Sequence, residues 1–203
     1  LFRSLMSLTV HPVEYVYSEY DIHNCYNYMY WPVTLEIPNF VELEIKKPDI
    51  WNTTGQLTNG RLSIALDRSP ELDVFCSDLT RTNHSRILDI AYDADTELFR
   101  SRWRKDLQYY KYHSRMMNTI YHDSPGYYMP PHLDNSHIIL QLIINLVDNE
   151  TGTELYQFNS NEIAYTCSGK AGQGIMFFNS PGAVHGIRNI TQDRYILYSQ
   201  ITF

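Results

Sequence analysis

The sequence predicts a mainly β fold, an antiparallel sandwich or barrel, with helical support ahead of it in the chain. From about residue 116 onward, short apolar runs alternate with Gly, Pro, Asn and Asp, which is the pattern of short strands joined by turns. One of these runs, residues 138–147, is apolar on both of its alternating faces. Before them, residues 85–103 carry apolar side chains at steps of three and four, as an amphipathic helix does.

The chain length fits one domain. It has 203 residues, against about 150 for a typical domain, which argues against two independent enzymatic domains. We expect residues 1–112 to form a supporting region packed on the core, and residues 113–203 to form the core itself.

The first half of the chain contains short β-like runs and one helix. The β-like runs lie at residues 13–17 and 33–37. Ser85 is a suitable N-cap for the helix at residues 85–103, and we expect the apolar stripe of this helix to pack against one sheet. No function is predicted for the first 80 residues.

The second half supplies the strands of the expected core. These are the runs 116–121, 138–147, 154–158, 174–178 and 195–203. In the run 138–147, one face is entirely apolar, whereas Gln141 and Asn145 interrupt the other. A strand that is apolar on both faces is covered on both faces, and a buried Arg194 at the start of the last run needs an anionic partner. These inward polar groups predict a cavity inside the core.

Composition argues against nucleic acid and membranes as partners. The formal net charge is −7, the wrong sign for a surface that condenses onto phosphates or anionic lipid. The longest apolar run, 138–147, is far below the ~20 residues of a membrane helix. Cys25, Cys76 and Cys167 are odd in number and widely spaced, so they provide neither a disulfide framework nor a CxxC metal site. We therefore expect a reducing, cytoplasmic compartment.

The segment that contains residue 132 carries the pattern His-x-Asp. Side chains two apart on an extended chain project to the same side, so His132 and Asp134 can reach one point. Alone this pair carries little weight, because roughly half an HxD is expected by chance in this composition. His185, in a glycine-flanked turn after the run 174–178, is the candidate third ligand. Two imidazoles and one carboxylate can hold divalent iron and leave open positions, as in non-haem iron oxygenases.

A basic residue follows the candidate ligands in the chain. A hairpin after His185 would return Arg194 to the neighbourhood of the metal, where a guanidinium is suited to bidentate capture of a carboxylate. From the residues alone, other interpretations stay open. His185 could be a loop histidine, Arg194 could pair at a hairpin edge, and Tyr121 could be a packed core ring.

Taken together, these segments resemble a known enzyme family. The resemblance covers about residues 113–203 and rests on Tyr121 to Asp134, Asn145-Leu146, Gly152 to Leu155, Gly169 to Phe178, and His185 to Arg194. In order and spacing, they are similar to the iron(II)- and 2-oxoglutarate-dependent dioxygenases, in particular to their prolyl 4-hydroxylase-like branch.

The resemblance implies a double-stranded β-helix, or jelly roll, as the catalytic core. It implies Fe(II) held by His132, Asp134 and His185, with 2-oxoglutarate and O₂ as co-reactants and ascorbate as an accessory reductant. The far carboxylate of 2-oxoglutarate would pair with Arg194, and Tyr121 would contact the same molecule. The implied reaction hydroxylates a substrate C–H bond and releases succinate and CO₂. A further candidate contact to the cosubstrate is the cavity-facing Asn145.

The sequence departs from the family pattern in places. Met129 stands where the family often has Tyr, and Gly152-Thr153-Glu154 replaces a Gly-Gly-Glu turn. These differences leave the iron ligands in place and concern the substrate pocket. Asp134 argues against a halogenase-like relative, in which a small residue at this position frees a site for halide.

The resemblance does not fix the substrate. The branch suggests a peptidyl prolyl residue, and the alternatives are a free amino acid or another small metabolite, or a non-catalytic jelly-roll binding or structural module with a vestigial metal site. Nucleic-acid demethylation is disfavoured, because Gln200 stands where that family usually carries a second arginine. The sequence predicts no oligomeric state.

Overall fold

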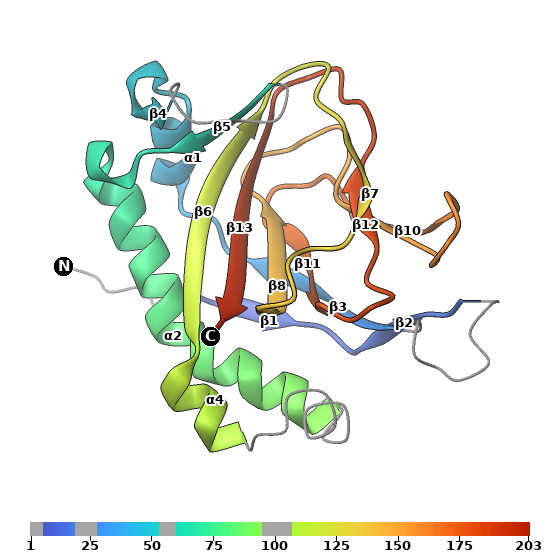
Figure 1. Cartoon of the computed structure of the whole chain (residues 1–203). Helices are drawn as coiled ribbons and strands as arrows, with labels where there is room; N and C mark the ends of the chain where they lie inside the picture. The colour runs from blue at the N-terminus through green and yellow to red at the C-terminus, as the bar shows by residue number, and fades with distance from the viewer. Residues whose placement is uncertain (1–5, 19–27, 53–59, 95–106) are drawn as a thin grey trace.

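The chain forms two antiparallel β-sheets that face each other, with helices on the outer side of the larger sheet (Figure 1). The structure is a computed structural model and describes residues 6–18, 28–52, 60–94 and 107–203. Cys25, and the part of the expected helix beyond residue 94, lie outside these ranges.

Within the described residues, the larger sheet has nine strands in the order β1-β3-β11-β8-β13-β6-β5-β4, and β2 also pairs with β3. Its strands are β1 (Leu8–Val10), β2 (Glu14–Val16), β3 (Tyr28–Leu35), β4 (Trp51–Asn52), β5 (Arg61–Ile64), β6 (Arg115–Asp123), β8 (Ile138–Asn145), β11 (Gln173–Phe178) and β13 (Arg194–Thr202). The smaller sheet has the order β10-β9-β12-β7. Its strands are β7 (Met129–His132), β9 (Glu154–Tyr156), β10 (Ile163–Thr166) and β12 (His185–Ile187).

The strand order from β6 to β13 is that of a jelly roll. Along the chain, β6, β8, β11 and β13 enter the larger sheet, while β7, β9, β10 and β12 enter the smaller one. The chain therefore winds back and forth between two facing sheets, and every strand pair is antiparallel. The predicted fold class is confirmed.

The N-terminal strands extend the larger sheet at both edges. β3 pairs with β11 at one edge, and β5 pairs with β6 at the other. The short helices in this half are α1 (Asn39–Ile45) and the 3₁₀ turns Pro48–Ile50 and Leu66–Arg68. Residues 61–64, early in the sequence, thus lie beside a strand of the jelly roll.

The central strand β8 is buried along its whole length, as its sequence predicts. Leu140, Leu142 and Ile144 belong to the main core on the helical side of the sheet, whereas Ile143 belongs to a second cluster between the sheets. The strand is covered on both faces because helices pack on one face and the smaller sheet covers the other.

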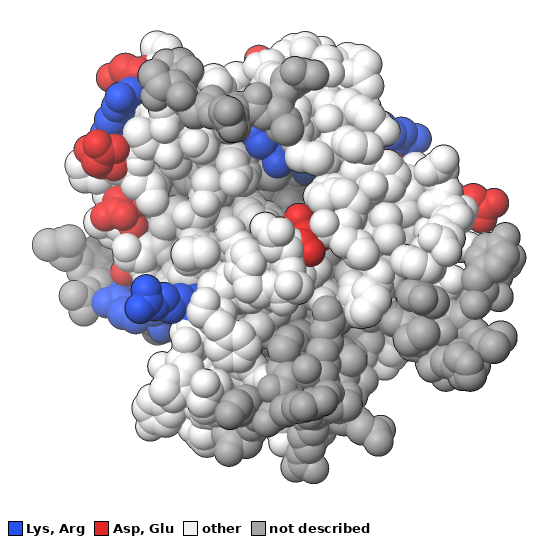
Figure 2. All heavy atoms as spheres, in the orientation of Figure 1, with Lys and Arg blue, Asp and Glu red and all other residues white. Residues whose placement is uncertain are grey.

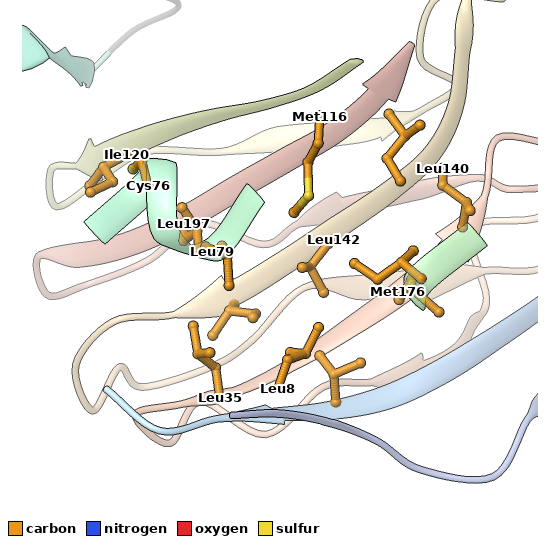
Figure 3. Close-up of a cluster of buried hydrophobic side chains, with 14 of the residues drawn as sticks. Leu8, Leu35, Cys76, Leu79, Met116, Ile120, Leu140, Leu142, Met176 and Leu197 are labelled. Atoms are coloured by element: carbon orange, nitrogen blue, oxygen red, sulfur yellow. The ribbon is translucent and has the colours of Figure 1, made fainter. Parts of the chain in front are cut away.

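Helix α2 (Pro70–Ala94) packs on the outer face of the larger sheet (Figures 1 and 3). Leu79 and Cys76 are buried against core residues of the sheet, and Asn118 of β6 donates to the Cys76 carbonyl at 2.8 Å. The expectation that the helix begins at Ser85 is wrong. It begins at Pro70, because proline has the backbone geometry that the first helical position requires.

Further along the chain, the short helix α4 spans Leu107–His113. It contacts α2 and carries the fully buried Tyr110. Among the residues that the structure describes, no helix combines the length and the apolarity needed to cross a membrane.

Candidate metal centre

Two short strands of the smaller sheet bring the two histidines together. His132 is the last residue of β7 and His185 is the first of β12, and the two are direct partners in the antiparallel register. Their ring centroids lie 4.4 Å apart. The expectation that His185 sits in a turn is corrected, because it begins a strand. Glycine at position 186 permits this close pairing, since a Cβ there would lie 2.7 Å from the Met129 carbonyl oxygen.

Asp134 lies just past the end of β7 and faces both imidazoles. Its Oδ1 lies 3.4 Å from Nε2 of His132, and its Oδ2 lies 3.7 Å from Nε2 of His185. The ligand atoms of the three residues all lie within 4.8 Å of one another. Two ligand atoms bound at right angles, each about 2.1 Å from one ion, are about 3 Å apart. The two distances from Asp134 to the histidines, 3.4 and 3.7 Å, exceed this separation by less than an ångström.

Backbone carbonyls orient both imidazoles for binding through Nε2. Nδ1 of His132 donates to the Pro130 carbonyl at 2.9 Å, and Nδ1 of His185 donates to the Ala183 carbonyl at 3.1 Å. Because a carbonyl only accepts, Nδ1 carries the proton in each ring, and Nε2 keeps a lone pair directed at Asp134. This is the outer-shell arrangement that metal-binding histidines use.

The local electrostatics keep the carboxylate charged and one imidazole neutral. Burial opposes ionisation of Asp134, but its close contact with the His132 imidazole, the proximity of His185 and the Tyr198 hydroxyl outweigh it and lower the pKa to about 2. Burial and the neighbouring His132 lower the pKa of His185 to about 4. At neutral pH, this imidazole is therefore unprotonated and the carboxylate is ionised, as metal ligands must be.

No protein-family model matches the sequence, and neither does any curated protein.

The chain is similar to prolyl hydroxylase structures. One is a prolyl-4-hydroxylase from Pseudomonas putida, with 18% sequence identity and a TM-score of 0.36. The match covers 43% of this chain and 51% of the other, so it spans about half of that protein. Another is a prolyl hydroxylase from Trichoplax adhaerens in complex with a hypoxia inducible factor peptide, with 12% identity, a TM-score of 0.44, and coverage of 79% and 74%. A third structure is a dioxygenase for auxin oxidation from Arabidopsis thaliana in complex with 2-oxoglutarate, with 12% identity, a TM-score of 0.46, and coverage of 82% and 73%.

A cavity of about 180 Å³ opens beside the three side chains. Its volume is below the ~300–1,000 Å³ of pockets for drug-sized ligands, so a small molecule fits it. Figure 2 shows basic side chains at a hollow on this face of the molecule and an acidic side chain near its rim. The uncharged residues that line the cavity include Tyr121, Met129, Ile143, Thr153, Ile196 and Tyr198.

Arg194 reaches this cavity from the start of β13 and is almost completely buried, with a side chain 3% exposed. Its Nη1 donates to Oδ2 of Asp123 at 3.0 Å, and its Nη2 donates to Oγ1 of Thr153 at 3.1 Å. The expected anionic partner is therefore present in the protein itself. Nε of Arg194 is buried and has no hydrogen-bond partner among the described residues.

Of the two other candidate residues, Tyr121 lines the cavity and Asn145 does not. Tyr121 lines the same cavity and is partly buried. Asn145 is not among the described residues that line it. The Asn145 amide donates to the carbonyls of Ser168 and Gln173 and accepts from Asn149, so it ties neighbouring loops together at the end of β8. These contacts differ from the cosubstrate contact expected for Asn145.

Two charged residues of the cavity region, Arg61 and Asp123, were not singled out from the sequence. Asp123 lies two residues after Tyr121 on β6 and thus on the same face of the strand. Asp123 could have been found from the sequence, because an aspartate that points inward at the end of a strand requires a partner when it is buried. Arg61 gave no local signal, since β5 has only four residues and its partner lies 62 positions later.

Proposed function

We propose that the chain is an Fe(II)- and 2-oxoglutarate-dependent dioxygenase that hydroxylates a C–H bond of a peptide or small-molecule substrate. The observation that carries this proposal is the convergence of His132, Asp134 and His185, with both Nε2 lone pairs directed inward, beside a small cavity with a buried guanidinium. This donor set fits divalent iron and leaves positions for co-reactants. When bound, the iron would supply oxygen activation coupled to decarboxylation of 2-oxoglutarate to succinate and CO₂.

The residues around the donor set have distinct parts in this proposal. The two histidines and Asp134 bind and orient the ion. Arg194 attracts the far carboxylate of 2-oxoglutarate, since a buried guanidinium binds a carboxylate strongly. Ile143 and Ile196 line the cavity with apolar surface and keep water from its interior. Tyr198 holds Asp134 in place through a hydrogen bond of 2.7 Å.

An open groove on the other side of His132 is the proposed entry for the substrate. It has a volume of about 310 Å³ and is lined by Pro131–Leu133, Phe158–Asn161 and Val184. His132 lines both this groove and the inner cavity, so a substrate in the groove would lie next to the ion. Because the groove is open at the surface, it can accept an extended peptide, and a prolyl residue is the first side chain to test.

The test is succinate formation by the full chain with Fe(II), 2-oxoglutarate, ascorbate and O₂. We expect His132→Ala to abolish turnover, because it removes an iron ligand. We expect Arg194→Ala to act mainly through a KM for 2-oxoglutarate raised by about tenfold or more, because a buried charge-assisted hydrogen bond contributes about 1.5–3 kcal/mol.

His137→Ala is the matched control. His137 is exposed and lies three residues after Asp134, so this variant should keep wild-type turnover and KM. The proposal is contradicted by a folded wild-type chain that forms no succinate, with or without candidate peptides, and shows no metal-dependent binding of 2-oxoglutarate.

A further inference from the structure

A second arginine, Arg61, which comes from outside the jelly roll, lines the cavity together with Arg194. Asp123 of β6 is the direct cross-strand partner of Arg194 on β13 and of Arg61 on β5. Arg61 donates from Nε and Nη2 to the two oxygens of Asp123, at 2.6 and 2.9 Å. The carboxylate thus lies between two guanidiniums, and the three side chains carry a formal charge of 2 − 1 = +1.

This positive charge is buried. The side chain of Asp123 is 0% exposed, that of Arg194 is 3% exposed and that of Arg61 is 16% exposed. An unbalanced charge is costly in such surroundings unless another ion pairs with it. Nε of Arg194 also lacks an acceptor within the described residues. One further anionic group would balance the charge of the cluster and supply an acceptor.

Arg61 is held in place and still has donors to offer. Its guanidinium carbon lies 4.6 Å from the ring centroids of both Tyr121 and Tyr127, which fixes the plane of the group by cation–π contacts. A guanidinium has five N–H donors, and in the described part of the chain Asp123 takes two of those of Arg61. Arg61 and Arg194 both line the cavity that contains the three candidate metal ligands.

We propose that Arg61 is a second anion-binding residue of this cavity, which holds the far carboxylate of a small dicarboxylate together with Arg194, and that Asp123 positions both guanidiniums. This inference rests on the proposed function and extends it, because it assigns selection of the cosubstrate in part to β5. A net charge of +1 matches a singly charged carboxylate, and the cavity admits only a small molecule. The inference therefore predicts discrimination by the tail charge of the ligand.

The test compares two ligands that differ only at the far end of the chain, where one carries a carboxylate and the other a methyl group. The full chain loaded with Mn(II) is titrated calorimetrically with 2-oxoglutarate and with 2-oxopentanoate, which has the same chain length but no far carboxylate. We expect wild-type protein to prefer 2-oxoglutarate. We expect Arg61→Gln to reduce this preference about tenfold or more while leaving the dissociation constant of 2-oxopentanoate unchanged. An Arg61→Gln variant with the wild-type preference would overturn the inference.

Arg81→Gln is the matched control, because Arg81 lies on α2 with a side chain 57% exposed and pairs with Asp78, far from the residues that line the cavity. It should keep the wild-type preference. Circular dichroism establishes that each variant is folded. If Arg61→Gln does not fold, Arg61→Met decides, since methionine keeps an unbranched side chain that packs well but removes the charge and the donors. A reduced preference then supports the inference and an unchanged preference refutes it.

Failure of the proposed function gives a different result. A wild-type chain that binds no Mn(II) and forms no succinate would refute the dioxygenase. The metal-free chain is then titrated with glutarate, a dicarboxylate that has no chelating keto group. Glutarate binding that Arg61→Gln weakens would still support a two-arginine anion site, whereas binding that is absent or insensitive to this substitution would refute it.

Discussion

Tyr198 orients the candidate metal ligand Asp134 from the opposite sheet. Its hydroxyl donates to Oδ2 of Asp134 at 2.7 Å, so it helps to fix the carboxylate that faces the two histidines. We expect Tyr198→Phe to weaken metal binding by about 10–100-fold, because loss of an outer-shell partner costs about that much. An anaerobic titration with Fe(II) measures the change.

Tyr195→Phe serves as the comparison, since Tyr195 lies on the same strand and stacks on His122 with ring centroids 4.6 Å apart. This variant should bind metal like the wild type. Equal metal affinities of the Tyr198→Phe and wild-type chains would show that Asp134 is held without the hydroxyl.

At the scale of single residues, part of the site could be predicted from the sequence. The clustering of His132 and Asp134 follows from their spacing, because an extended chain places both side chains on one side. Arg61 could not be found in this way. Its position depends on the pairing of β5 with β6, which joins segments about sixty residues apart in the chain. No local pattern of residues encodes such a pairing.

Helix α2 is the element that covers the outer face of the larger sheet. Leu79 is fully buried in the cluster of Figure 3. We expect Leu79→Ala to lower the free energy of unfolding by about 2–5 kcal/mol, because it removes buried methyl groups and leaves a cavity. Urea unfolding followed by circular dichroism measures it.

Val74→Ala, on the same helix but 58% exposed, should change the free energy of unfolding by only about 0.5 kcal/mol. If Leu79→Ala and Val74→Ala lower the free energy of unfolding by the same small amount, the helix does not contribute to the core in the way that the packing indicates.

Elements with a long or repeated pattern were predictable, and short ones were not. β8 was predicted because eight successive buried residues leave an apolar run on both faces. β7 and β12 have four and three residues and contain proline or glycine, so they lack a recognisable alternation. Their pairing is imposed by the jelly roll as a whole, and it determines where His132 and His185 meet.

For the whole molecule, the fold class was predictable from the distribution of apolar runs, but the extent of the larger sheet was not. Its outer strands come from the N-terminal part of the chain, where the sequence indicated only the β-like runs 13–17 and 33–37, which overlap β2 and β3 but not β5. Strand β5 brings Arg61 to Asp123. The chemical surroundings of the cavity therefore depend on parts of the chain far apart in sequence, and they form only when the complete sheet has folded.

We propose that His132, Asp134 and His185, at one end of the jelly roll, hold one divalent ion. The most direct measurement is an anaerobic titration of the full chain with Fe(II), with the bound metal determined per chain. We predict one ion per wild-type chain and loss of that ion in each of His132→Ala, Asp134→Ala and His185→Ala. A wild-type chain that takes up no ion, or variants that retain it in full, would contradict the account.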